Sequence, residues 1–318
     1  MSSREATTTC IVCSSTRVSA AGQIAVADVV RGYRRRFGLD VSGQFAGLRS
    51  LTELNCPDCD LRWFWPLVTG DESFYRELAA HAWYYMPEKP EFAIARRFIA
   101  PADVVLEAGA GRGAFAAQCA GGYVGLEFSP AAVEQARQSG VNVIAEPVET
   151  HAAAHAGTYD VCCAFQVVEH VSDPLAFVRS MAAATKPGGR VIVSVPSEQG
   201  LPGRTINDFL NLPPHHVTRW TDKALAALAS SAGLSIEAIE HEPVAGYHRG
   251  WHLALRLYGL LAPRLIAGPG NRVRMKFADY ALWRALWLLA GVSARILRAL
   301  PAGTGDGHTV VAVMRKDG

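Results

Sequence analysis

From residue 104 onward, short apolar runs alternate with segments whose apolar residues recur at helical spacing. Strands are predicted at 104–106, 123–126, 141–145, 159–165, 191–195, 234–239 and 308–314. Helices are predicted between them at 114–120, 131–138, 174–184 and 222–232. This alternation predicts an α/β fold with a doubly wound, mostly parallel sheet.

The pattern differs before and after this region. Residues 1–68 contain four of the seven cysteines, and residues 69–100 contain an aromatic stretch and a short helix. The predicted core, 101–243, is followed by an apolar, basic segment at 244–305 and by a last strand within 306–318. We therefore expect an N-terminal module, a lid or linker, and a core interrupted by an insertion before its last strand.

A glycine-rich turn joins the first predicted strand to the helix after it. Gly109, Gly111 and Gly113 allow a sharp turn and the close approach of a ligand. The spacing also fits a dinucleotide site, with Glu127 after the second strand to bind a ribose. Glu107 separates the two cofactors, because a carboxylate here would repel a pyrophosphate but attract a sulfonium compound that carries an ammonium group. The turn therefore favours a sulfonium cofactor over a nicotinamide.

Four motifs, in order over about ninety residues, resemble the class I S-adenosylmethionine-dependent methyltransferase domain. They are Glu107-x-Gly109-x-Gly111, Gly125-Leu-Glu127-Phe128-Ser129-Pro130, Phe165-Gln-Val-Val-Glu169-His170-Val171 and Lys186-Pro-Gly-Gly189-Arg-Val-Ile-Val-Ser-Val-Pro196. The resemblance implies a seven-stranded sheet whose last strand is antiparallel. It also implies S-adenosyl-L-methionine as the cofactor.

The same resemblance assigns roles to matching positions. It implies that Glu127 holds the ribose and that Phe128 lies against the adenine. Pro147 and Val148 would lie near the adenine edge, and Gln166 near the methionine part.

An aromatic run at 83–86, with Tyr84 and Tyr85, matches a place where the family has a lid over the cofactor. The alternative is a helix that packs these aromatic side chains on the core.

Three histidines follow predicted strand ends, where open α/β sheets bind ligands. His170 follows the fourth strand, and His215 and His216 lie in the segment Pro213–Trp220. That segment is similar to a signature in bacterial methyltransferases of glycan and natural-product pathways. Transfer to a hydroxyl needs a base that works near neutral pH, so all three are candidate catalytic residues, with His216 or His170 as the base. The alternative is that they only shape the loops.

Two CxxC pairs, Cys10 with Cys13 and Cys56 with Cys59, supply four thiolates. Four cysteines are typical of a closed, structural Zn²⁺ site, although their separation exceeds the usual spacing of about 15–20 residues. A chance arrangement and an iron–sulfur cluster are the alternatives. Such a module ahead of a methyltransferase domain resembles the sugar methyltransferases of deoxysugar pathways, some of which methylate carbon.

Charge changes the picture only in segment 244–305. It contains nine Lys and Arg but one acid, Asp279, whereas the whole chain has a formal net charge of +2. A helix is predicted over 281–300, with arginines on one side and leucines opposite. Two interpretations stay open: the apolar side packs on its own domain, or residues 251–300 form a peripheral membrane contact. Basic residues tied to an apolar insertion argue against nucleic acid as a partner.

The start of the chain has no apolar run of the secretory kind, and no stretch reaches the roughly 18 apolar residues of a membrane span. We therefore expect a cytoplasmic protein, either free or peripheral to the inner face of the membrane. The expected function is O-methylation of a hydroxyl on a sugar or glycoconjugate. The alternatives are C-methylation of a keto-sugar and a non-catalytic nucleotide-binding or scaffold protein; the sequence does not indicate an oligomeric state.

Overall fold

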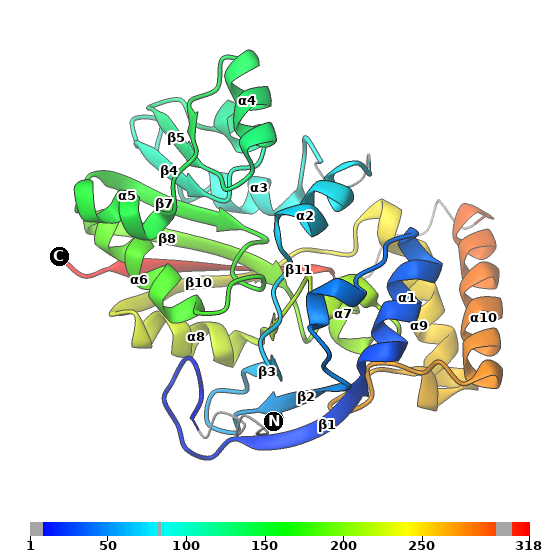
Figure 1. The fold of residues 1–318 in the computed structure, drawn as a ribbon. Helices are drawn as coiled ribbons and strands as arrows, with labels where there is room; N and C mark the ends of the chain where they lie inside the picture. The colour runs from blue at the N-terminus through cyan, green and yellow to red at the C-terminus, as the bar shows by residue number, and fades with distance from the viewer. Residues whose placement is uncertain (1–8, 82–83, 85, 297–306) are drawn as a thin grey trace.

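A seven-stranded sheet forms the centre of the protein (Figure 1). The computed structural model describes residues 9–81, 84, 86–296 and 307–318. The strands are β4 (Val105–Ala108), β5 (Tyr123–Leu126), β6 (Val143–Ile144), β7 (Tyr159–Phe165), β8 (Thr185–Pro196), β10 (Leu234–His241) and β11 (Thr309–Lys316). They pair in the order β10-β11-β8-β7-β4-β5-β6, and β11 alone runs in the opposite direction to the other strands. The predicted fold class, with its antiparallel last strand, is confirmed.

Helices cover both faces of this sheet. One face packs against α5 (Val148–Ala154), α6 (Pro174–Ala184) and α8 (Asp222–Ser231). The other packs against α3 (Pro90–Arg96) and the 3-10 helix η2 (Ala114–Gln118), and α4 (Pro130–Gln138) lies beside β6 at the edge. The neighbours Cys162 and Cys163 are buried on opposite faces, as alternation along a strand requires.

Within the alternating part of the core, two predicted elements are shorter in the structure, and helix α5 was not predicted. The strand expected over 141–145 is reduced to β6, because at the sheet edge it pairs with β5 alone. The helix expected over 114–120 is a short 3-10 turn, because Cys119 is already extended and two glycines follow it. Helix α5 has seven residues, too few for a recognisable apolar period.

The N-terminal module is a second, four-stranded sheet. It contains β1 (Ser19–Ala25), β2 (Ser50–Asn55) and β3 (Arg62–Trp65), with α1 (Val26–Phe37), η1 (Ser42–Phe45) and α2 (Glu72–Ala79) around it. Its fourth strand, β9 (Thr218–Arg219), comes from the loop that carries the paired histidines. The module therefore holds this loop directly against the core.

The basic segment forms a helical insertion before β11. It contains η4 (Gly246–His248), α9 (Arg249–Leu261), η5 (Pro263–Leu265) and α10 (Phe277–Ile296). Helix α9 packs on α7 (Leu201–Arg204), and the 3-10 helix η3 (Phe209–Asn211) precedes the histidine loop. Tyr258 and Trp283 are buried between α9 and α10, and the Tyr258 hydroxyl donates to the Trp283 carbonyl over 2.9 Å. Helix α10 begins four residues before the predicted helix, whose end lies outside the described residues. Among the described helices, none is long and apolar enough to cross a membrane.

A buried network of charges connects the module, the core and the insertion. Arg272 of the insertion is paired with Glu53 of β2 over 2.7 Å and also with Glu198 after β8. Glu198 is paired in turn with Arg219 of β9 over 2.8 Å. These groups are almost wholly buried, so each charge depends on its partners.

Candidate active site

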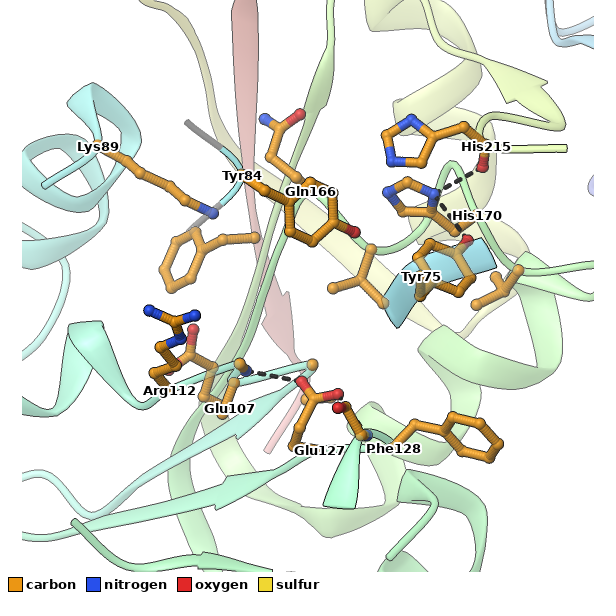
Figure 2. A pocket seen from close by; sticks show the side chains of 18 of the residues that line it. Tyr75, Tyr84, Lys89, Glu107, Arg112, Glu127, Phe128, Gln166, His170 and His215 are labelled. Carbon is orange, nitrogen blue, oxygen red and sulfur yellow. Dashed lines mark hydrogen bonds between the residues drawn. The ribbon is translucent and has the colours of Figure 1, made fainter. Parts of the chain in front are cut away.

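A cavity of about 1660 Å³ lies at the carboxyl ends of the parallel strands. Its wall combines the glycine loop, the turns after β5, β6 and β7, the histidine loop, the segment before α3, and the start of the insertion. Figure 2 shows that these side chains converge from elements far apart in the chain.

The glycine loop follows β4 with left-handed backbone at three positions. The φ angles of Gly109, Gly111 and Gly113 are 76°, 56° and 76°. A Cβ on Gly109 would lie 2.4 Å from a methyl carbon of Val167, so both the backbone angle and the space require glycine there. The sharp turn and the close approach that were predicted from the glycines are therefore both present at Gly109.

Glu127 lines the cavity beside this loop. Its carboxylate accepts hydrogen bonds from the Gly111 amide over 2.7 Å and from the Ser129 amide over 2.8 Å (Figure 2). The carboxylate thus ties the glycine loop to the end of β5, at the position from which it is expected to bind a ribose.

Glu107 lines the same cavity and is 3 % exposed. The Tyr123 hydroxyl donates to it over 2.5 Å. Burial raises the pKa of Glu107 to about 8, although the hydrogen bond from Tyr123 and the charge of Lys89 oppose this. The pKa of this carboxyl therefore lies close to neutral pH, and a cation that approached it would favour the ionised form.

The expected adenine positions also line the cavity. Phe128 is 78 % exposed there, Pro147 precedes α5, and Val148 is buried. Sequence reasoning missed Glu146, which also lines the cavity and lies 2.8 Å from Nδ1 of the buried His151. A carboxylate and a histidine five residues apart give no recognisable signal until a turn brings them together.

Gln166 directly follows β7 with a φ of 58°, a strained angle for a residue with a side chain. Its amide donates to Thr309 over 3.3 Å and to Glu91 over 3.4 Å. Glu91 was not predicted as a site residue. It is 3 % exposed, and burial raises the pKa of its carboxyl.

The aromatic segment reaches the cavity through Tyr84 and also through Tyr75 of α2, which sequence reasoning missed. The Tyr75 hydroxyl lies 3.3 Å from His170 Nδ1 (Figure 2). Tyr85 and Trp83 lie outside the described residues.

The three predicted histidines form one cluster on the cavity wall. One ring nitrogen from each of His170, His215 and His216 lies within 4.8 Å of the others. The Glu169 carbonyl accepts from the Val217 amide over 2.8 Å, which fixes the histidine loop beside the turn after β7. Tertiary structure thus joins residues that are 45 positions apart.

The hydrogen bonds of the cluster identify its tautomers. Nδ1–H of His170 donates to the His215 carbonyl over 2.6 Å, and Nδ1–H of His215 donates to the Leu210 carbonyl over 2.9 Å. In both rings Nε2 therefore carries a lone pair. Burial lowers the pKa of His170 to about 4 and that of His215 well below its usual value, so both are neutral near pH 7.

His216 has the opposite tautomer. Arg219 can only donate, so the Asn211 amide oxygen faces it at 3.1 and 3.2 Å and the Asn211 NH₂ donates to His216 Nδ1 over 3.0 Å. Nε2 of neutral His216 therefore carries the proton. It lies 3.9 Å from Glu169 Oε1.

Glu169 is fully buried behind the cluster. Neither carboxylate oxygen has a hydrogen-bond partner among the described residues, and Oε1 also lies 3.9 Å from His170 Nε2. Burial raises the pKa of this carboxyl to about 8.

The opposite end of the cavity is formed by the insertion and the ends of β10 and β11. Glu242 accepts from the His308 amide over 2.9 Å and lies 3.8 Å from His248. Tyr247 and Trp251 line this end too, and Tyr247 is 60 % exposed. This end of the cavity, the insertion chamber, offers carboxyl and imidazole groups beside aromatic rings.

The four N-terminal cysteines also come together as predicted. Sγ of Cys10 lies 3.6 Å from that of Cys59, and Sγ of Cys13 lies 3.6 Å from that of Cys56. All four sulfurs lie within 4.8 Å of one another, and the cysteines are free. Thiolates about 2.3 Å from one tetrahedral ion would be about 3.8 Å apart, so these residues fit a zinc ion.

Comparisons with known proteins agree with this geometry. Residues 78–239, more than half of the chain, match the family model described as a methyltransferase domain. A ubiquinone biosynthesis O-methyltransferase of Escherichia fergusonii is 41 % identical over 105 residues, which cover 30 % of this chain and 44 % of that protein. One from Vibrio parahaemolyticus is 42 % identical over 99 residues, covering 28 % and 42 %. The chain thus spans less than half the length of these relatives.

Solved structures with a similar course of the chain have low identity. A methyltransferase from Archaeoglobus fulgidus is 14 % identical with a TM-score of 0.47, covering 77 % of this chain and 100 % of that one. The 1,6-didemethyltoxoflavin-N1-methyltransferase of Burkholderia thailandensis is 16 % identical with a TM-score of 0.47, covering 86 % and 97 %. On the family match and its own sheet, the chain belongs to the class I S-adenosylmethionine-dependent methyltransferases.

Proposed function

We propose that the protein transfers the methyl group of S-adenosylmethionine to a hydroxyl of a sugar or glycoconjugate, with His170 as the general base. The observation that carries this proposal is the neutral His170 ring, whose Nε2 lone pair lies in a cavity that also contains the glycine loop. The names of the sequence relatives, which are O-methyltransferases, support oxygen as the acceptor atom.

Methyl transfer is an in-line displacement at a carbon that the sulfonium already activates. The protein has to align the acceptor oxygen and remove its proton. His170 can accept that proton at Nε2, because Nδ1 is fixed by the His215 carbonyl. His216 is less suited to this step, because its Nδ1 already accepts from Asn211 and its Nε2 carries a proton.

The insertion chamber supports a hydroxylated acceptor. Carboxyl groups of Glu91 and Glu242 can accept hydrogen bonds from sugar hydroxyls, and Trp251 offers an apolar face for a ring. The relatives' names suggest a different acceptor, one from ubiquinone biosynthesis, and turnover separates this alternative from a sugar.

Acceptor class is tested by turnover with nucleotide sugars, lipid-linked glycans and catechols as three separate panels. We expect methylation of a sugar, and the bond formed is identified by NMR of the product. A new carbon–methyl bond would favour the C-methyltransferase alternative. Binding of S-adenosylhomocysteine by calorimetry without turnover on any panel would favour a scaffold protein.

The base is tested with His170→Gln and, as a matched variant, His216→Gln. We expect kcat to fall by about 10²- to 10⁴-fold in the first, because proton removal is lost, while the affinity for S-adenosylhomocysteine is retained. The second should lose less, because His216 does not take up the proton. Near wild-type turnover in both variants would exclude a histidine base.

We further propose that Cys10, Cys13, Cys56 and Cys59 hold a structural Zn²⁺ ion. The mutual distances of the four sulfurs support it. We expect this site to contribute one zinc equivalent per chain, and the variant Cys56→Ser/Cys59→Ser to lose that equivalent relative to the unaltered chain, as measured by elemental analysis. Cys119→Ser is the matched control, because this thiol lies apart from the cluster, and an unchanged metal content in the double variant would contradict the site.

A further inference from the structure

The histidine cluster has more free ligand atoms than a general base requires. Nε2 of His170 and Nε2 of His215 both carry lone pairs, and both Nδ1–H groups are fixed by main-chain carbonyls. Metal-binding histidines are held in the same way, with the second ring nitrogen donating to a carbonyl or carboxylate. Figure 2 shows the His170 and His215 rings side by side at the cavity wall.

Buried atoms without partners surround the same space. His215 Nε2 and both carboxylate oxygens of Glu169 have no hydrogen-bond partner among the described residues. A buried polar atom costs free energy unless something binds it, and here three such atoms belong to two residues of one cluster. Three polar atoms of one cluster can therefore all bind a ligand that enters this space.

The distances suit a small cation. Glu169 Oε1 lies 3.9 Å from His170 Nε2, whereas two ligands about 2.0–2.1 Å from one tetrahedral ion are about 3.3 Å apart, so a small shift of the side chains would bring both into coordination distance. Nε2–H of His216 faces the same carboxylate oxygen at 3.9 Å and can orient it after a small shift. Two imidazoles and one carboxylate are the ligand set of catalytic zinc sites, which keep a position open.

We propose that His170, His215 and Glu169 bind a divalent transition-metal ion, with Zn²⁺ as the best match, at the wall of the methyl-transfer cavity. The role of this ion in catalysis rests on the proposed function. The acceptor's hydroxyl oxygen occupies the open position, and the ion weakens its O–H bond. The proton passes to the second oxygen of Glu169, the alkoxide oxygen bonds to the methyl carbon, and the C–S electron pair returns to sulfur. In the metal-free protein, His170 accepts the proton directly.

The test counts metal equivalents on the full chain, by equilibrium dialysis against Zn²⁺ and by absorption spectra with Co²⁺. We expect two equivalents. Cys56→Ser/Cys59→Ser should remove one, together with the thiolate-to-cobalt charge-transfer band. His170→Gln/His215→Gln should remove the other and leave that band intact, and Glu169→Gln should weaken the second site at least tenfold.

His248→Gln is the matched control, because His248 is a half-buried histidine of the same cavity outside the cluster. It should retain both equivalents. A single equivalent that depends wholly on the cysteines would overturn the metal centre, as would a second equivalent that survives the His170/His215 double variant. Circular dichroism of each variant verifies that the fold is intact, so that loss of metal reports on the ligands.

The measurement separates this inference from the proposed function. Methyl transfer to an acceptor by a protein with only the cysteine-bound ion would overturn the centre and leave His170 as the base. Two equivalents without transfer to any acceptor would support the centre and contradict the proposed function.

Discussion

Glu107 is the residue at which burial and cofactor charge oppose each other. In the free protein burial raises its pKa to about 8, so the carboxyl is mostly protonated at pH 7. A bound cofactor with an ammonium and a sulfonium group would stabilise the carboxylate and lower that pKa. Glu107, which favours a sulfonium cofactor in the sequence, would thus also link the binding of that cofactor to the release of a proton.

At pH 7 we predict that binding of S-adenosylmethionine releases close to one proton from Glu107. The affinity should rise with pH up to about 8 and then level off, because only the ionised carboxyl pairs with the cation. Calorimetry in buffers of different ionisation enthalpy measures the proton. Glu107→Gln should bind more weakly and without the pH dependence, and a release that persists in this variant would assign the proton to another group.

At the scale of elements, the insertion buries one side of each helix and exposes apolar residues on the other. Trp283 and Leu286 of α10 are buried, whereas Phe277 and Leu288 are 89 % and 60 % exposed. Arg284 belongs to the same exposed stripe, since residues three and four apart share a helix face. The interpretation that the apolar side packs on its own domain therefore holds for the buried side of α10, and the membrane contact stays a prediction for the exposed side.

We predict that the exposed side of the insertion binds anionic vesicles. Leu260 of α9 and Phe277 and Leu288 of α10 provide apolar surface, and nearby arginines provide attraction to anionic lipid. Co-sedimentation should be stronger with phosphatidylglycerol vesicles than with phosphatidylcholine vesicles and should fall in Leu260→Gln/Leu288→Gln. Absence of binding to both kinds of vesicle would contradict the membrane contact.

At the scale of the whole molecule, the buried charges decide how its parts are joined. Arg272 connects the insertion to Glu53 of the N-terminal sheet and to Glu198 of the core. Because Glu53 is fully buried, removal of the arginine leaves an uncompensated charge.

We predict that Arg272→Met lowers the free energy of unfolding by about 3–5 kcal/mol. Urea denaturation followed by circular dichroism measures the change. Arg137→Met is the matched control, because Arg137 forms an exposed pair with Glu134 and its loss should leave the midpoint unchanged. Equal midpoints for both variants would show that the network does not hold the three parts together.

The local patterns gave the residue types of the site but not their neighbours. The glycine loop, Glu127 and the four cysteines were predictable, because each depends on a short motif with a steric or chemical reason. Glu91 and Tyr75 were not, because each becomes part of the site only through a distant partner, and Glu146 was not, because only a turn brings it to His151 five residues later.

The sequence by itself determined the order of the strands of the central sheet along the chain, the glycine turn and the cysteine set, because these depend on periodicity and on residues close together in the chain. Only the tertiary structure decided that His170, His215 and His216 share one cluster, which tautomer each has, and that the Glu169 carboxylate lies behind them with no hydrogen-bond partner in the described part of the chain. Those properties arise where strand β9 carries the histidine loop into the N-terminal sheet. Pairing between segments more than 150 residues apart leaves no periodic trace in the sequence.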